Sequence, residues 1–117
     1  MSGMFDISEN VAWMPAGWVF DGVVELIAAE LKTENPSLAA ALLQARTEAT
    51  GYCDIRTLDA TQFRSLLEAV ERTYARLLEE KTSAFHNAKF RAGFINQFRE
   101  LKALLSMDVR GVATSKA

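Results

Sequence analysis

The sequence predicts an all-α protein: a single-domain bundle or orthogonal array of about four helices, with an N-terminal arm packed on it. Four segments repeat apolar residues at intervals of three and four, the spacing of amphipathic helices. Short polar or Gly/Pro-containing breaks separate these segments, as in helical bundles. Hydrophobic residues make up 50% and charged residues 24% of the 117 positions, which is globular composition. We therefore expect residues 1–117 to form one α-helical domain.

Residues 1–17 have no sustained helical period, and Pro15 and Gly17 mark the end of the segment. The segment is too apolar for a solvated tail, so we expect it to lie as an arm across the helices. Trp13 and Trp18 flank the Pro–Gly break. We therefore expect both indoles to be partly exposed and able to anchor a partner.

The first helix is expected from about Trp18 to Lys32, with an apolar stripe of Phe20, Val23, Val24, Ile27, Ala28 and Leu31. Gly22 costs about 1 kcal/mol relative to alanine within a helix, so its presence indicates a close neighbour. The outer face carries four acidic residues, Asp21, Glu25, Glu30 and Glu34. Like charges four residues apart repel mildly, so these acids either solvate the helix or form a surface for a basic partner.

The second helix is expected to begin at Asn35-Pro36, a cap followed by proline at the first helical position, and to run to about Glu48. Its alanines at 39–41 would let another helix approach closely. The connector GYCDIRT, residues 51–57, has no helical stripe and fits a short extended or looped segment.

The third helix, from Leu58 to about Glu80, is the best specified. Asp59 can cap its first turn, and Gln62 stands where a variant capping box would close. We expect this helix to be the central element, with the first and fourth helices packed against it. Its apolar stripe comprises Phe63, Leu66, Leu67, Val70, Tyr74, Leu77 and Leu78.

The fourth helix is expected after a polar break at residues 81–87 and should end near Met107. Its apolar face is largely aromatic, comprising Phe90, Phe94, Phe98, Leu101 and Leu105. Residues 108–117 are small and polar without a period, and we expect them to fray.

Charge is distributed unevenly along the chain. The first 34 residues contain six acidic residues and one lysine, whereas the last 37 contain seven basic and two acidic residues. The two segments could attract one another, the interpretation we favour, or could form separate faces for partners. The basic flank of the fourth helix could touch phosphates, but the pI is about 5.4 and no helix-turn-helix spacing is present. We do not expect a nucleic-acid partner.

Motifs that would indicate an enzyme, a metal site or a cofactor site are missing from the sequence. It has one histidine, His86, and one cysteine, Cys53, so a Cys/His zinc site would need carboxylates for most of its ligands. A nucleophilic Cys53–His86 pair is formally open, but free cysteines are most often small buried hydrophobes. No Glu-x-x-His pair, phosphate loop or nucleophile elbow occurs. We expect no catalytic residue, no metal and no cofactor.

The lengths of the apolar segments bear on localisation. None of them approaches the roughly 20 residues that span a bilayer. The segment MSGMFDISEN has no basic residue before an apolar stretch, as a secretory signal would. We expect a cytoplasmic protein without a membrane segment.

Three segments together resemble small bacterial immunity proteins encoded beside secreted toxins, among them immunity proteins of contact-dependent growth inhibition: GWVFDGVVELIAAEL, GYCDIRTLD and QFRSLLEAVERTYARLL. The similarity extends from about Trp18 to Leu78 and is one of size, order and character. No family binding residue transfers to a numbered position.

This resemblance implies stoichiometric inhibition, in which the protein binds a cognate toxin domain, for example a basic nuclease, and covers its active site or another surface that it needs. The acids of the first helix would steer association, and exposed aromatic residues would anchor the partner. The alternative is a self-associating helical module without a toxin partner, for example a homodimer formed through the second or fourth helix. The expected partner-binding residues are Asp21, Glu25, Glu30, Glu34, Asp54, Trp13 and Trp18.

Overall fold

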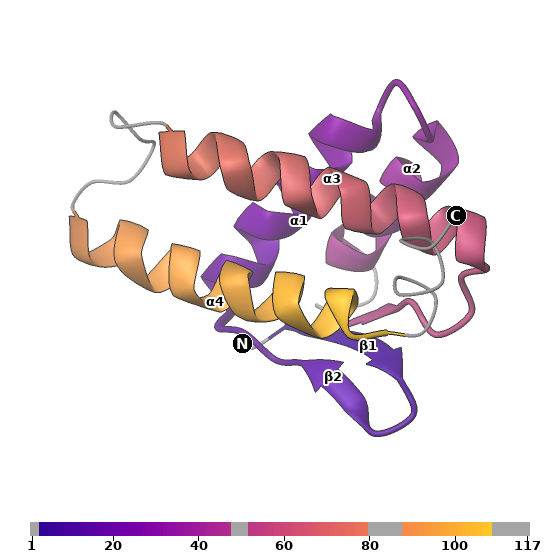
Figure 1. Ribbon diagram of the computed structural model, residues 1–117, viewed down its shortest axis with the longest axis horizontal. Helices are drawn as coiled ribbons and strands as arrows, with labels where there is room; N and C mark the ends of the chain where they lie inside the picture. The colour runs from indigo at the N-terminus through magenta and orange to yellow at the C-terminus, as the bar shows by residue number, and fades with distance from the viewer. Residues whose placement is uncertain (1–2, 48–51, 80–87, 109–117) are drawn as a thin grey trace.

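The fold consists of four helices and three short strands. The computed structural model describes residues 3–47, 52–79 and 88–108. In chain order the elements are β1 (Met4–Ser8), β2 (Val11–Trp13), α1 (Gly17–Leu31), α2 (Pro36–Thr47), β3 (Tyr52–Asp54), α3 (Ala60–Glu79) and α4 (Ala88–Ser106). In Figure 1, α3 and α4 extend side by side across the molecule, and the β1–β2 hairpin lies below α4.

The four predicted helices are present, and their capping residues act as expected. Asn35 accepts a hydrogen bond from the Leu38 N–H on its side-chain Oδ1 at 3.2 Å, which caps α2. Asp59 accepts one from the Gln62 N–H on Oδ1 at 2.8 Å, which caps α3. Each cap satisfies a backbone donor that the first helical turn leaves without a partner.

The all-α prediction is wrong, because three segments form a mixed sheet with the strand order β2-β1-β3. β1 pairs antiparallel with β2 and parallel with β3. A parallel pair needs a long crossover, and here α1 and α2 lie between the two strands in the chain. The connector that was expected to be extended or looped thus supplies one edge of the sheet.

The segment expected to form an arm is a β-hairpin whose apolar side chains enter the core. Phe5 and Ile7 are buried, and Asn10 adopts a left-handed conformation with φ 67° in the turn. The expectation that Trp13 is partly exposed is wrong, since its side chain is 0% exposed. Its Nε1–H donates to the backbone oxygen of Gln97 at 2.8 Å, which ties β2 to α4.

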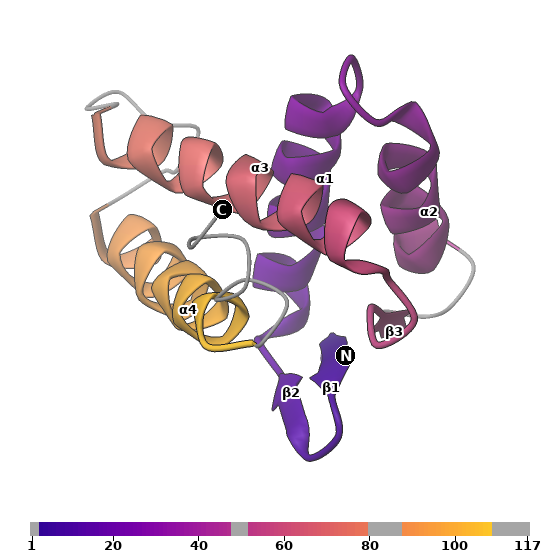
Figure 2. The same cartoon turned by 45° about the vertical axis from the view of Figure 1, so that its right-hand side comes forward.

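As expected, α1 and α4 pack against α3, but α1 is the helix that packs against each of the other three. Figure 2 shows α1 beside α2, with α3 crossing in front of it and α4 on its other side. Gly22 permits the approach of α4, since a Cβ at this position would lie 2.8 Å from Cε2 of Phe94. The close neighbour predicted at Gly22 is therefore confirmed.

Some expectations fall outside the part of the chain that the structure describes, among them those for His86, for the polar break at 81–87 and for residues 109–117 of the tail. Within the described residues, the helices are too short or too polar to cross a membrane.

Candidate partner-binding surface

The outer face of α1 brings together three of the seven predicted partner-binding residues. Trp18, Asp21 and Glu25 are spaced i, i+3 and i+7, so they share one side of the helix, and all three are exposed. Trp18 is 47% exposed, and its ring centroid lies 6.0 Å from that of Phe94 on α4. Contact with Phe94 restricts the indole while half of its surface remains in solvent, which suits an anchoring residue.

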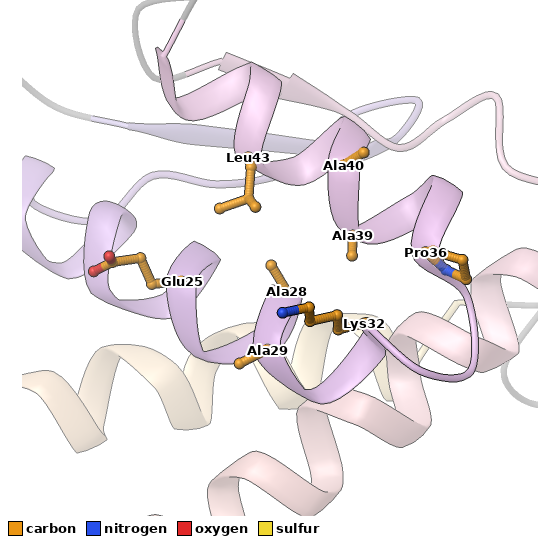
Figure 3. A pocket seen from close by; sticks show the side chains of 8 residues that line it. All are labelled: Glu25, Ala28, Ala29, Lys32, Pro36, Ala39, Ala40 and Leu43. Atoms are coloured by element: carbon orange, nitrogen blue, oxygen red, sulfur yellow. The ribbon is translucent and has the colours of Figure 1, made fainter.

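A groove with a volume of about 390 Å³ continues this face toward α2. Ala28 on α1 and Ala39 on α2 are buried at its floor, and Leu43 is 40% exposed on the α2 side. Figure 3 shows Leu43 pointing from α2 toward α1. The remaining lining residues are Glu25, Ala29, Lys32, Pro36 and Ala40. The groove exists because small side chains occupy positions where longer ones would fill the space.

The groove carries one charged residue of each sign. Lys32 lies one turn of α1 beyond Ala28, and Figure 3 shows its ammonium group turned back over Ala28. Glu25 lies at the other end, with its carboxylate pointing away from the groove. The surface is thus apolar at the centre and oppositely charged at its two ends.

The other two acids predicted on the first helix contact α3. Glu30 accepts a hydrogen bond from Arg72 Nε at 3.1 Å and forms an ion pair with Arg76 Nη1 at 2.7 Å, and its side chain is 12% exposed. Glu34 pairs with Nη2 of Arg72. The predicted ridge of four acids is therefore divided into Asp21 and Glu25 on the outer face of α1, and Glu30 with Glu34 of the following turn, which pair with α3.

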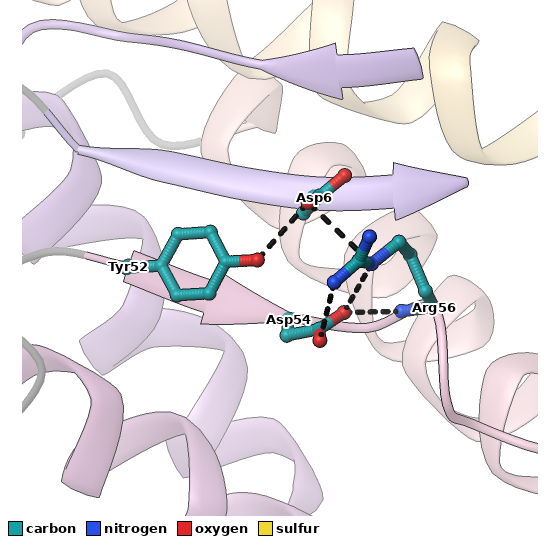
Figure 4. A network of polar contacts seen from close by, with 4 residues as sticks. All are labelled: Asp6, Tyr52, Asp54 and Arg56. Atoms are coloured by element: carbon teal, nitrogen blue, oxygen red, sulfur yellow. Dashed lines mark hydrogen bonds and ion pairs between the residues drawn. The ribbon is translucent and has the colours of Figure 1, made fainter. Parts of the chain in front are cut away.

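Asp54 belongs to a polar network on the sheet, shown in Figure 4. Its carboxylate receives Arg56 Nε on Oδ1 at 2.9 Å and Arg56 Nη2 on Oδ2 at 3.0 Å. Asp6 on β1 accepts the Tyr52 hydroxyl at 3.0 Å and forms an ion pair with Arg56 Nε at 3.4 Å. Asp54 thus holds Arg56 and its loop in place, and the network links β1 to β3.

These contacts shift the pKa values of two residues in the network. The hydrogen bonds from Arg56 to the Asp54 carboxylate hold the pKa of Asp54 below its ordinary value. The hydrogen bond from Tyr52 to the Asp6 carboxylate raises the pKa of the tyrosine above its ordinary value. At neutral pH both shifts favour a charged Asp54 and a neutral Tyr52.

The structure does not favour nucleophilic chemistry at Cys53. Its thiol is buried beneath the sheet surface, and burial raises the pKa of Cys53 to about 12. A thiol with this pKa is protonated at neutral pH, whereas the thiolate is the reactive form.

Sequence reasoning missed the groove because its lining comes from two helices. The alanines at 39–41 were a signal, since they indicated a close helix neighbour. Ala39 meets that expectation, while Ala40 faces the groove. The polar network around Asp54 was also missed. Its members Asp6 and Tyr52 meet through a parallel strand pair and lie 46 residues apart in the sequence.

Comparison with known proteins identifies a structural relative. No protein-family model matches this chain, and no curated protein sequence matches it. The chain is similar to one in the solved structure of the CdiA-CT toxin from Burkholderia pseudomallei E479 in complex with cognate CdiI immunity protein. The TM-score is 0.75 at 18% sequence identity, over 93% of this chain and 98% of that chain. The resemblance to immunity proteins of contact-dependent growth inhibition is thus confirmed at the level of fold: this chain has the fold of a chain from a CdiA-CT–CdiI complex.

Proposed function

We propose that this protein is an immunity protein that binds a cognate toxin domain and neutralises it by stoichiometric contact. The observation that carries the proposal is the structural relative, whose solved structure is that of a CdiA-CT toxin with its cognate CdiI immunity protein. The match includes nearly the whole of both chains, so the likeness extends to the complete arrangement of helices and strands.

The outer face of α1 is the contact surface in this proposal. Trp18 supplies a partly held aromatic side chain, and Asp21 and Glu25 supply exposed negative charge beside it. Interface energy concentrates in such aromatic anchors, whereas charges around them set the rate and specificity of association. Trp13 supports the surface from within, since it joins the hairpin to α4.

Three of the predicted binding acids have a supporting role in this proposal. Glu30 and Glu34 hold α1 against α3, and Asp54 holds Arg56 beside the sheet. Their loss would act on binding through the shape of the protein, because their carboxylates are engaged within the chain.

The acidic contact surface fits a basic partner, and a basic nuclease domain is one such toxin. Opposite charges would accelerate encounter, and the acceleration would weaken as salt screens the charges. A toxin that acts on nucleic acid would carry basic residues at its active site, which a bound immunity protein could cover.

Coexpression with the C-terminal domain of the protein encoded immediately upstream tests the proposal. We expect a 1:1 complex that survives affinity purification and size exclusion, and we expect this chain to restore growth to cells that express the toxin domain. Failure of both would reject the function. Light scattering on the isolated chain examines the alternative, because a self-associating module would show a mass that rises with concentration.

A further inference from the structure

We propose that the groove between α1 and α2 receives the apolar face of an amphipathic helix from the toxin domain, with a basic residue of that helix beside Glu25. This inference rests on the proposed toxin-binding function and names the part of the surface that carries binding energy. The helix would lie along the groove next to Trp18, so that both features belong to one interface.

The shape of the groove supports a helix as its occupant. α1 and α2 are joined by the short segment 32–35 and lie side by side (Figure 2). The residues that line the groove extend from Glu25 to Lys32 and from Pro36 to Leu43, so the groove follows both helices. Grooves of this kind accept the apolar face of a helix, whose anchors recur every three to four residues. Ala28 and Ala39 form a floor that a partner side chain can reach.

The composition of the groove supports an apolar contact. Alanine, leucine and proline supply six of the eight lining residues, and Leu43 leaves 40% of its surface in solvent. Burial of such surface favours binding, and an anchor in a pocket that excludes water contributes more than one on a flat face. The groove therefore provides an apolar contact area beside a charged surface.

The charges at the two ends specify the orientation of the partner helix. Glu25 on α1 and Lys32 at the C-cap of α1 lie seven residues apart, which is about 10 Å along a helix axis. A partner helix that places a lysine or arginine near Glu25 and an acidic residue near Lys32 would match the charge at each end of the groove. The exposed Asp21, one turn before Glu25, extends the negative end and favours the basic residue there.

Groove-filling variants test the inference without touching the core. Ala29 and Ala40 are exposed, so Ala29→Leu and Ala40→Leu should fold normally while occupying the space that the partner needs. Ala41→Leu is the matched control, because Ala41 is exposed on the same helix and does not line the groove. Calorimetry with the purified upstream toxin domain should give at least a tenfold higher Kd for each groove variant, and a change below about twofold for the control.

A charge exchange provides a second measurement. Glu25→Lys should raise the Kd for the toxin domain at least tenfold, since it places a base against the basic end of the partner helix. Circular dichroism would verify that every variant keeps the helical content of the wild type.

The outcomes separate the inference from the function on which it rests. Wild-type binding with unchanged Kd values for Ala29→Leu and Ala40→Leu would overturn the groove site and leave the function standing. A concentration-dependent dimer of the wild type that Ala40→Leu abolishes, with toxin affinity unchanged, would assign the groove to a second copy and also overturn it. Absence of wild-type binding would reject both proposals.

Discussion

Arg72 on α3 donates a hydrogen bond from Nε to Oε1 of Glu30 on α1 across 3.1 Å, so an acid from the predicted binding ridge joins two helices. The hydrogen bond to Glu30 is also the main reason that the pKa of Arg72 is raised above its ordinary value. Arg76 forms an ion pair with the other oxygen of Glu30, at 2.7 Å. Neighbouring acids on α1 therefore have different roles, since Glu30 joins α1 to α3, whereas Glu25 lies exposed at one end of the groove.

This division predicts effects of different size on stability for the same substitution at Glu30 and at Glu25. Glu30→Gln should lower the free energy of unfolding by about 1 kcal/mol, because a largely buried carboxylate loses charged partners on α3. Glu25→Gln should change it by less than about 0.5 kcal/mol, as expected for an exposed position. Urea denaturation measures both. Equal losses of stability would contradict the separation of roles.

Gly22→Ala should destabilise the protein even though alanine favours a helix. The new Cβ would lie 2.8 Å from Cε2 of Phe94, whose ring is 2% exposed and packs against Trp18 and Phe98. Overpacking costs about 1 to 3 kcal/mol, which offsets the gain of about 1 kcal/mol in helix propensity. Thermal denaturation should show a lower Tm for Gly22→Ala.

A double mutant separates crowding from backbone effects at Gly22. Phe94→Leu removes the ring atoms that the new methyl group would meet. Gly22→Ala should therefore cost less in the Phe94→Leu background than in the wild type, and an equal cost in both would exclude the crowding explanation.

The double variant Asp21→Asn with Glu25→Gln should bind the toxin domain more slowly at low salt. Removal of exposed negative charge lowers the association rate for a basic partner and makes that rate less sensitive to ionic strength. Stopped-flow measurements from 20 mM to 500 mM salt should therefore give a flatter dependence for the variant. Glu68→Gln with Glu71→Gln, on exposed positions of α3, is the control and should follow the wild type.

Cys53 should make stability sensitive to alkaline pH. Burial raises the pKa of its thiol to about 12 in the folded protein, against about 8.5 in an unfolded chain. The contribution of the buried thiol is complete below pH 8.5 and is lost as pH rises toward 12, because the unfolded chain releases the proton first. The free energy of unfolding should thus fall between pH 8.5 and 10, and less steeply in Cys53→Ala.

The reactivity of the thiol offers an independent measurement of the same burial. A disulfide reagent at pH 8 should label native Cys53 slowly and the urea-unfolded protein rapidly. Rapid labelling of the native protein would show that the thiol is accessible and would contradict the expected pH dependence.

Local sequence signals predicted the helices well, because each helix is encoded by its own stripe and caps. The expected helices at 18–32 and 36–48 differ by about one residue from α1 and α2. Asn35 and Asp59 cap through side chains that lie beside the helix start in sequence, so their function could be read directly.

The sheet was harder to predict because its information is not local. Met4–Ser8 alternates buried and partly exposed residues, and Asn10 follows in a left-handed turn, so the hairpin had a weak signal. The parallel pairing of Phe5 with Cys53 had no signal in the sequence, since it depends on the packing of two intervening helices. The burial of Trp13 likewise depends on Gln97, which lies 84 residues away.

The predicted partner-binding residues also fell into two groups because contacts between helices are not local in the sequence. Helical spacing placed Asp21 and Glu25 on the outer face of the first helix, and the structure exposes both there, beside Trp18. Spacing within α1 could not reveal that Arg72 and Arg76 would meet Glu30 from another helix. The groove similarly required the relative position of α1 and α2.

Binding of the purified chain to the C-terminal domain of the protein encoded immediately upstream decides whether the chain is an immunity protein. Isothermal titration calorimetry should give a stoichiometry of one and a Kd below about 1 μM, with loss of the domain's toxicity in the complex. Absence of binding, or binding that leaves the toxicity unchanged, would contradict the account.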